Sequence, residues 1–191
     1  GACAFEAAEY RKTRIMKEAG FNAIRSAHNP ISKAMLNACD ELGMYVMDEA
    51  FDNWVKNPGM YGHVMYFKDE WEKDLRDMVL KDLNHPSVIM YSTGNEITDT
   101  AFPDGIEWAE KMTKLCHELD DSRPVTCCIN LFLNVLAQKG GAPKIAENKI
   151  NKEDITDPLA EASDSQMGGS MFINLLVATG PFLQKLLMTP K

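Results

Sequence analysis

The sequence has little positive charge. Lysine and arginine together number 20, against 28 aspartates and glutamates, which gives a formal net charge of -8. The basic residues are also scattered along the chain and do not form clusters. Because binding to a phosphate backbone needs clustered cations, this composition argues against a nucleic-acid partner. A neutral or weakly charged substrate is easier to accommodate.

Metal-binding cysteine motifs and membrane-length apolar runs are missing as well. The five cysteines form no C-x-x-C pair, which indicates neither a zinc site nor a disulfide framework. Reduced thiols favour a cytoplasmic location, with the periplasm left open. The uncharged run at residues 171–183 is interrupted by Gly180 and Pro181 and is shorter than the roughly 20 residues of a membrane span. It therefore predicts a buried helix, and no membrane partner is expected.

Amphipathic segments alternate with wholly apolar ones along the first two thirds of the chain. Ser32 stands where a helix N-cap is expected, and Gly43 stands where that helix should stop. Helical spacing occurs at residues 5–19, 32–43, 71–83 and 106–119, and apolar strands are predicted at 21–26, at 45–47, at the start of 87–97 and at 125–129. Apolar strands separated by single helices imply parallel pairing, so the fold class is α/β.

The polar residues distinguish two architectures of this class, an open doubly wound sheet and a (β/α)8 barrel. No glycine-rich phosphate loop follows any strand, so the nucleotide-binding form of the open sheet lacks its signature. Polar residues instead follow successive strands, at 25–30, at 48–52, at 94–96 and at Asn130. A barrel collects its chemistry at these carboxyl ends, where a polar cleft offsets the desolvation of a charge. The sequence therefore predicts part of a (β/α)8 barrel.

Three runs of residues carry a resemblance to a known family, and they read GFNAIRSAHNP, LGMYVMDEAFDNW and NHPSVIMYSTGNE. In this order and spacing, about residues 1–130 resemble the catalytic TIM barrel of glycoside hydrolase family 2, which includes bacterial β-galactosidases and β-glucuronidases. The resemblance implies a carbohydrate substrate. It also implies hydrolysis of O-glycosidic bonds at the non-reducing end of β-galactosides or related β-glycosides, by a retaining double displacement.

The resemblance also assigns roles to single residues. Glu96 would be the catalytic general acid/base, and Asn95 would hydrogen-bond the sugar 2-hydroxyl. His28 would contact the sugar, while Arg25 would brace the barrel interior. The chemistry itself requires two carboxyls, held roughly 5 Å apart in a retaining enzyme. Each role has an alternative, because Glu96 could instead cap the next helix or pair with a lysine, and His28 could simply pack beside Pro30.

Four further residues near the strand ends have two interpretations each. Asp52 and Trp54 are placed to line the cleft and bind substrate, the indole offering a flat face to a sugar, but a tryptophan in a loop is as often a core residue. Asp48 and Glu49 could touch substrate. A structural role is favoured for both, as a buried pair that holds Arg25.

Part of the family pattern has no counterpart after Asn130. No later strand ends in a glutamate, residues 138–169 are rich in Lys, Glu, Asp and Gly, and residues 170–188 predict a helix with one break. We therefore expect residues 1–191 to be a fragment of one catalytic barrel domain. Residues 1–130 would hold about four central βα units, and 131–191 a long loop plus a C-terminal helix. The nucleophile would lie outside the chain, the fragment alone would be inactive, and its two open strand edges would promote self-association.

Metal and cofactor are not expected. Some β-galactosidases of the family bind magnesium through a Glu and a His just after the Asp-Glu of the second strand, where this chain has Asn53 and Val55. Two other functions remain open: a catalytically inactive barrel that binds or senses carbohydrate, and an inverting barrel glycosidase of another clan.

Overall fold

The computed structural model describes residues 5–56 and 63–139 and the backbone of residues 174–179. Its strands form one sheet in the order β1-β2-β3-β4-β5. Strands β1 to β4 are parallel to one another, and β5 runs antiparallel to β4. The elements are α1 (Glu6–Glu18), β1 (Ala23–Arg25), α2 (Lys33–Leu42), β2 (Tyr45–Glu49), the 3-10 helix η1 (His63–Met65), α3 (Phe67–Asp82), β3 (Val88–Ser92), the 3-10 helix η2 (Thr98–Ala101), α4 (Pro103–Leu119), β4 (Val125–Asn130), α5 (Leu131–Gln138) and β5 (Asn174–Thr179).

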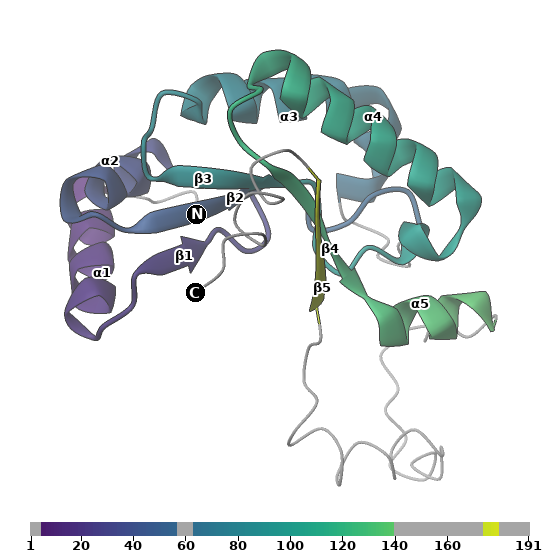
Figure 1. The fold of residues 1–191 in the computed structure, drawn as a ribbon, viewed down its shortest axis with the longest axis horizontal. Coiled ribbons are helices and arrows are strands. Elements are labelled where there is room, and N and C mark those ends of the chain that lie inside the picture. The colour runs from purple at the N-terminus through teal and green to yellow at the C-terminus, as the bar shows by residue number, and fades with distance from the viewer. Residues whose placement is uncertain (1–4, 57–62, 140–173, 180–191) are drawn as a thin grey trace, which may run out of the picture.

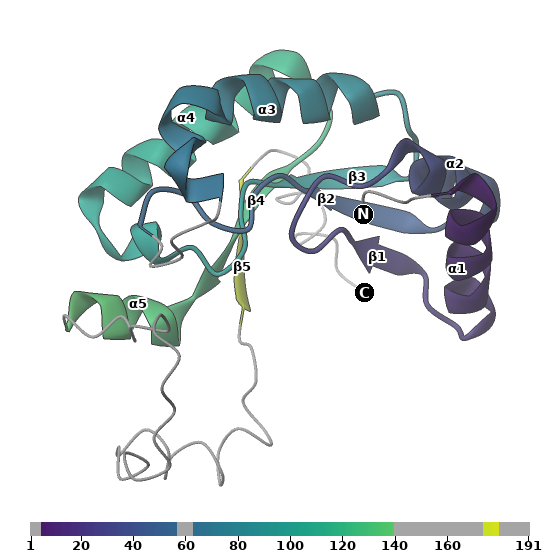
Figure 2. The same cartoon turned by 180° about the vertical axis from the view of Figure 1, so that it is seen from behind.

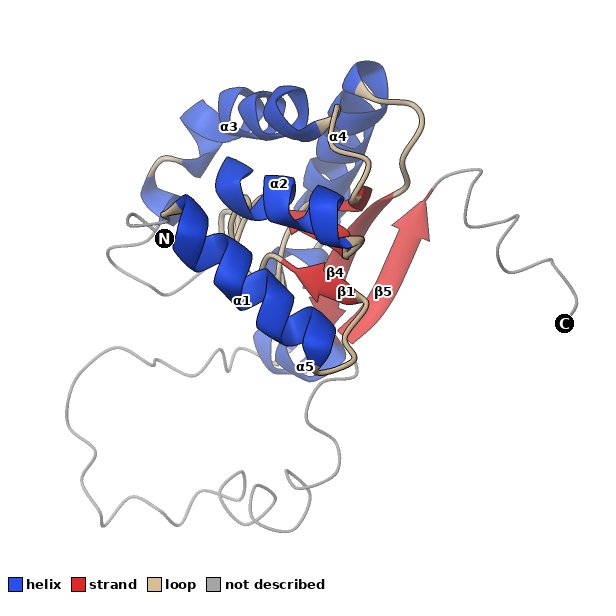
Figure 3. Ribbon diagram, turned by 90° about the vertical axis from the view of Figure 1, so that its left-hand side faces the viewer, coloured by secondary structure: helices blue, strands red, loops and turns tan. Residues whose placement is uncertain are grey.

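The sheet is curved, and helices cover its outer side. Figure 1 shows α3 and α4 above the sheet and α1 and α2 beyond the amino ends of β1 to β3. Figure 2 shows the same arrangement from behind, with α5 beyond the carboxyl end of β4. The pairs α1–α2 and α3–α4 pack against each other, and Figure 3 shows the helices and the sheet as separate layers. This arrangement confirms the expected partial barrel.

Local sequence signals fix the ends of the second helix. The side chain of Ser32 accepts a hydrogen bond from the backbone N–H of Met35, 3.2 Å away, as an N-cap should. Gly43 ends the helix in the left-handed conformation, with φ of 69°, which glycine adopts without a steric penalty. The next strand starts two residues later, so these two caps set where β2 enters the sheet.

One hydrophobic core lies between the sheet and the helices. Leu36 of α2, Leu75 of α3 and Met112 of α4 are fully buried, as are Val46 of β2 and Val125 of β4. Successive side chains of a strand point to opposite faces, so a register shift of one residue would turn the buried side chains of a strand to the wrong face. The parallel register pairs Glu49 with Ser92 and Ser92 with Thr126, which aligns the carboxyl ends of β2, β3 and β4.

The structure differs from the sequence prediction after β4. The expected long loop begins with helix α5, because Asn130 caps its amino end. Where a helix is predicted over 170–188, residues 174–179 form β5; the rest of that segment lies outside the described residues. The free edge of β4 offers a ladder of backbone groups, and this tertiary partner overrides local helical propensity.

Two open strand edges were expected, but β5 pairs with the edge of β4, so that edge is not open. Self-association through strand edges stays a prediction, which light scattering would test. Across the described part of the chain, none of the helices has the length and apolar character needed to span a bilayer.

Candidate active site

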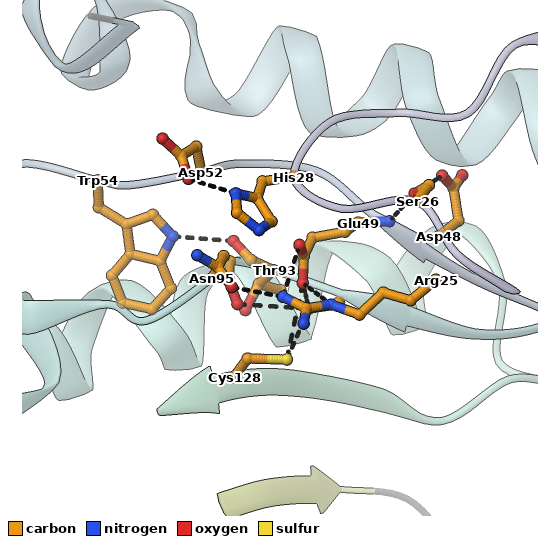
Figure 4. A network of polar contacts seen from close by, with 12 residues as sticks. Arg25, Ser26, His28, Asp48, Glu49, Asp52, Trp54, Thr93, Asn95 and Cys128 are labelled. Atoms are coloured by element: carbon orange, nitrogen blue, oxygen red, sulfur yellow. Dashed lines mark hydrogen bonds and ion pairs between the residues drawn. The ribbon is translucent and has the colours of Figure 1, made fainter. Parts of the chain in front are cut away.

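The carboxyl ends of β1 and β2 and the loop after β3 bring three predicted residues together. Arg25 Nη2 lies 2.9 Å from Glu49 Oε1, and Arg25 Nε lies 3.1 Å from Glu49 Oε2, so the ion pair is bidentate. The same Nη2 donates to Asn95 Oδ1 at 2.5 Å. Figure 4 shows Arg25 reaching across the strand ends to both partners. The expected bracing role of Arg25 thus has a defined geometry, with Glu49 as its ionic partner.

Glu49 is fully buried, and several hydrogen-bond donors contact its carboxylate. Besides Arg25, Ser92 Oγ donates to Glu49 Oε2 at 2.8 Å, and Cys128 Sγ lies 3.6 Å from the same oxygen. Burial disfavours the charged form of Arg25, but the hydrogen bonds and charge of Glu49, with the charge of Glu96, outweigh it and raise the pKa of Arg25. A permanently charged guanidinium therefore lies just beneath the strand ends.

Glu96 follows β3 in a short turn, and its backbone has φ of 48°. Residues with a side chain rarely take this left-handed conformation, and one that does so is held by its surroundings. The backbone N–H of Asn95 donates to the carbonyl of Phe51 at 3.1 Å. Glu96 as a whole residue is only partly buried, and Asn130 Nδ2 donates to its Oε1 at 3.0 Å. Glu96 is thus a strand-end carboxyl with one fixed oxygen and access to solvent.

His28 and Asp52 form a second, more exposed pair at the same edge. His28 Nδ1 lies 2.8 Å from Asp52 Oδ1, and Figure 4 shows the imidazole and this carboxylate facing each other above the Arg25 cluster. A pocket of about 520 Å³ lies beside the pair, lined by Asp52 and Asn53 and by α3 residues including Asp77 and Lys81. Asn95 and Glu96 are not among its lining residues, so this pocket adjoins the strand-end cluster and is not its centre.

Trp54 does not line a cleft in this structure. Its side chain is fully buried, and its Nε1 donates to the backbone carbonyl of Thr93 at 2.8 Å (Figure 4). The indole also stacks on Phe67 of α3, with ring centroids 6.4 Å apart. Of the two interpretations left open by the sequence, the core residue is the one observed, because the indole is held between Thr93 and Phe67.

Asp48 also departs from its expected role as a partner of Arg25. Successive side chains of a strand point to opposite faces, so Asp48 faces away from Glu49. Its Oδ1 accepts hydrogen bonds from Ser26 Oγ at 3.1 Å and from the N–H of Ile31 at 3.0 Å. Among the described residues its Oδ2 has no hydrogen-bond donor. Burial and then the carboxylate of Asp82 raise the pKa of Asp48 to about 8.

Three residues of the site were not singled out as candidates from the sequence. Ser92 and Cys128 contact Glu49, and Asn130 contacts Glu96. The sequence could have indicated Asn130, because it is the polar residue that ends the fourth strand. Ser92 lies opposite Glu49 in the parallel register, which can be inferred only when the pairing is known. Over the residues the structure describes, no group of three or more His, Cys, Asp or Glu side chains could hold a metal ion.

Comparison with protein families gives a match that covers most of the chain. The family model for glycosyl hydrolases family 2, TIM barrel domain, matches residues 4–155. The matched segment includes all the strand-end residues described above. The catalytic barrel that the sequence resembles is therefore found by an independent comparison.

Curated relatives and solved structures are similar to the same part of the chain. The β-galactosidase BoGH2A of Bacteroides ovatus is 46% identical over 99 residues, 52% of this chain and 12% of that protein. A putative β-glucuronidase of Formosa agariphila is 36% identical over 102 residues, 53% of this chain and 10% of that protein. The matched part of the chain thus spans about a tenth of the length of these relatives.

Two crystal structures show the similarity in three dimensions. A glycosyl hydrolase family 2 member from Bacteroides cellulosilyticus has a TM-score of 0.66 at 46% identity, covering 72% of this chain and 18% of that chain. A family 2 β-galacturonidase from Eisenbergiella tayi, bound to galacturonate, has a TM-score of 0.60 at 26% identity, covering 70% of this chain and 24% of that chain.

Proposed function

Because the chain belongs to the family 2 glycosyl hydrolases, through their TIM barrel domain, we propose that it carries the acid/base part of a glycosidase active site. The reaction is hydrolysis of O-glycosidic bonds at the non-reducing end of β-galactosides or related β-glycosides. The observation that carries this proposal is the carboxyl of Glu96, partly open to solvent at the end of a parallel strand and held by Asn130. The names of the two curated relatives support the choice of substrate class.

The proposed mechanism is a retaining double displacement with two carboxyls. In the first step Glu96 gives its proton to the departing glycosidic oxygen, while a second carboxylate attacks the anomeric carbon and forms a glycosyl ester. In the second step Glu96, now ionised, takes a proton from water, and the oxygen of that water displaces the ester. The second carboxyl lies outside the described residues in this proposal.

The neighbouring residues would hold the sugar. Because Asn95 Oδ1 accepts from Arg25, its amide nitrogen is the group left to donate to the sugar 2-hydroxyl. His28 faces Asp52 with its Nδ1, which leaves Nε2 for a sugar hydroxyl. Asp52 is half exposed and can accept from a further hydroxyl. Arg25 and Glu49 bind no substrate in this scheme, since their bidentate pair keeps Asn95 in place.

Two broader assignments accompany this one. Residues 1–191 are proposed to be part of a single barrel domain, within which β1 to β4 supply the acid/base side of the cleft. The cysteines among the described residues are free and buried, and we take this as support for a reducing, cytoplasmic location, with the periplasm as the alternative.

The test is replacement of Glu96 in the protein at its natural length. Glu96→Gln should lower kcat/KM by about 100-fold or more on alkyl β-galactosides, whose leaving group needs a proton. The loss on a dinitrophenyl β-galactoside should be much smaller, because dinitrophenolate leaves without a proton. Azide should restore turnover of this activated substrate by Glu96→Ala and give a glycosyl azide, since an anionic nucleophile needs no general base.

Glu107→Gln, on the exposed face of α4, is the matched control and should behave like the wild type. Full activity of Glu96→Gln on alkyl galactosides would refute the acid/base assignment. If the natural-length wild type binds galactosides without hydrolysing them, the carbohydrate-binding barrel is correct instead. Inverted configuration of the first-formed sugar, measured by proton NMR, would favour an inverting glycosidase.

A further inference from the structure

The side chain of Asn130 makes two kinds of contact, one with the amino end of α5 and one with the carboxyl of Glu96. As the last residue of β4 it caps α5, with its Oδ1 accepting from the N–H of Phe132 at 3.1 Å and from the N–H of Leu133 at 3.2 Å. Its other side-chain atom, Nδ2, donates to Glu96 Oε1 at 3.0 Å. The cap fixes which way the amide faces, because only Oδ1 can accept from two backbone N–H groups. The amide nitrogen is therefore directed at Glu96.

This contact decides which oxygen of Glu96 can carry a proton. An oxygen that already accepts an N–H hydrogen bond cannot hold a proton along the same line without a clash of two hydrogens. In the protonated acid Oε1 is therefore the carbonyl oxygen, and the proton lies on Oε2. We propose that Asn130 is a positioning residue that fixes the carboxyl of Glu96 and keeps its transferable proton on Oε2. The inference rests on the proposed acid/base function of Glu96.

The backbone around Glu96 is already anchored on both sides. The N–H of Asn95 donates to Phe51, and the N–H of Ile97 donates to the carbonyl of Cys128 at 3.4 Å. The remaining freedom is in the side chain, which has three rotatable bonds and is only partly buried. Among the described residues, Asn130 is the one whose side chain donates a hydrogen bond to this carboxyl. The amide thus restricts the motion that would move the proton away from a leaving oxygen.

The capping role and the positioning role of Asn130 can be separated by substitution. Asn130→Ser keeps a good N-cap, but its hydroxyl is too short to reach Glu96. Asn130→Asp also keeps the cap and replaces the donor by a negative charge beside Glu96. Asn134→Ala is the matched control, because Asn134 lies on the same helix and its Nδ2 donates to Thr100 Oγ1 at 2.8 Å instead of to Glu96.

The assay compares two substrates in the protein at its natural length. For Asn130→Ser, kcat/KM on an alkyl β-galactoside should fall about 10- to 100-fold, a part of the whole general-acid effect. On a dinitrophenyl β-galactoside, kcat/KM should change less than about threefold. This ratio covers only the steps up to departure of the leaving group, and dinitrophenolate departs without a proton. For Asn130→Asp the basic limb of the pH profile should move to higher pH. Asn134→Ala should keep the wild-type ratio between the two substrates.

The outcomes distinguish this inference from the function on which it rests. An unchanged ratio between the two substrates in Asn130→Ser, together with a loss on alkyl substrates in Glu96→Gln, would refute the positioning role alone. If Asn130→Ser fails to fold, an unshifted pH profile of Asn130→Asp would refute it equally. If Glu96→Gln keeps full activity on alkyl substrates, the acid/base function itself fails.

Discussion

Replacing Asp48 by asparagine is expected to stabilise the fold above neutral pH. Asp48 is fully buried, its Oδ1 accepts from Ser26 and Ile31, and burial together with the neighbouring carboxylate of Asp82 raises its pKa. Lys81 donates to both oxygens of Asp82. Because the pKa of Asp48 is raised, the proton shared by the two acids is expected on Asp48. An asparagine keeps the acceptor and replaces the O–H donor by an N–H donor that is present at every pH.

The sign and the size of the effect follow from the two pKa values of Asp48. The pKa is about 8 in the folded protein and 3.8 for the unperturbed side chain. Between these values the folded state keeps a proton that the unfolded state has lost, so the free energy of unfolding falls as pH rises from about 4 to about 8. Each pKa unit corresponds to about 1.4 kcal/mol, and because the proton is shared, we expect a loss on the order of 2 to 5 kcal/mol.

The measurement is urea unfolding at pH 5 and at pH 9, followed by tryptophan fluorescence. The free energy of unfolding of Asp48→Asn should exceed that of the wild type slightly at pH 5 and by much more at pH 9. Asp121→Asn, which changes an exposed aspartate, controls for the change in net charge. Equal differences between pH 5 and pH 9 for the wild type and Asp48→Asn would show that Asp48 carries no proton in the folded state and refute the reasoning.

Three further predictions concern packing, the buried ion pair and the thiols. Gly105→Ala should cost at least about 2 kcal/mol and lower Tm, because the new Cβ would overlap the backbone carbonyl of Asp99. Arg25→Lys should cost about 2 to 4 kcal/mol in urea unfolding, since an ammonium cannot replace the bidentate pair with the buried Glu49; no loss would mean that the pair is not formed. The buried thiols should resist iodoacetamide at pH 8 until urea unfolds the protein, because burial raises their pKa to about 11 for Cys39 and about 12 for Cys116 and Cys127.

Features of the fold that depend on local chemistry could be predicted from the sequence. Ser32 and Gly43 delimit α2 because a hydroxyl cap and a left-handed glycine act within a few residues. The parallel order of β1 to β4 follows from apolar strands separated by single helices. The meeting of Arg25 with Asn95 follows in turn, since parallel strands end at one edge of the sheet.

Features that depend on distant partners could not be predicted. Nothing local decides whether Trp54 faces a cleft or the core, and its position is set by Thr93 and by Phe67 of α3. The partners of Asp48 depend on where the loop containing Ile31 lies, because the N–H of Ile31 donates to Asp48 Oδ1. The strand at residues 174–179 exists through its pairing with β4, across about fifty residues of sequence, and no periodicity within that segment indicates it.

The left-handed backbone at position 96 has an evolutionary consequence. Among the described residues, Glu96 is the one non-glycine with positive φ, a conformation that costs a residue with a side chain roughly 1 kcal/mol or more and costs glycine nothing. Selection for heat resistance alone should therefore drive this position toward glycine. A glutamate is expected at this position only where the function of its carboxyl outweighs the loss of folding stability that the left-handed conformation causes.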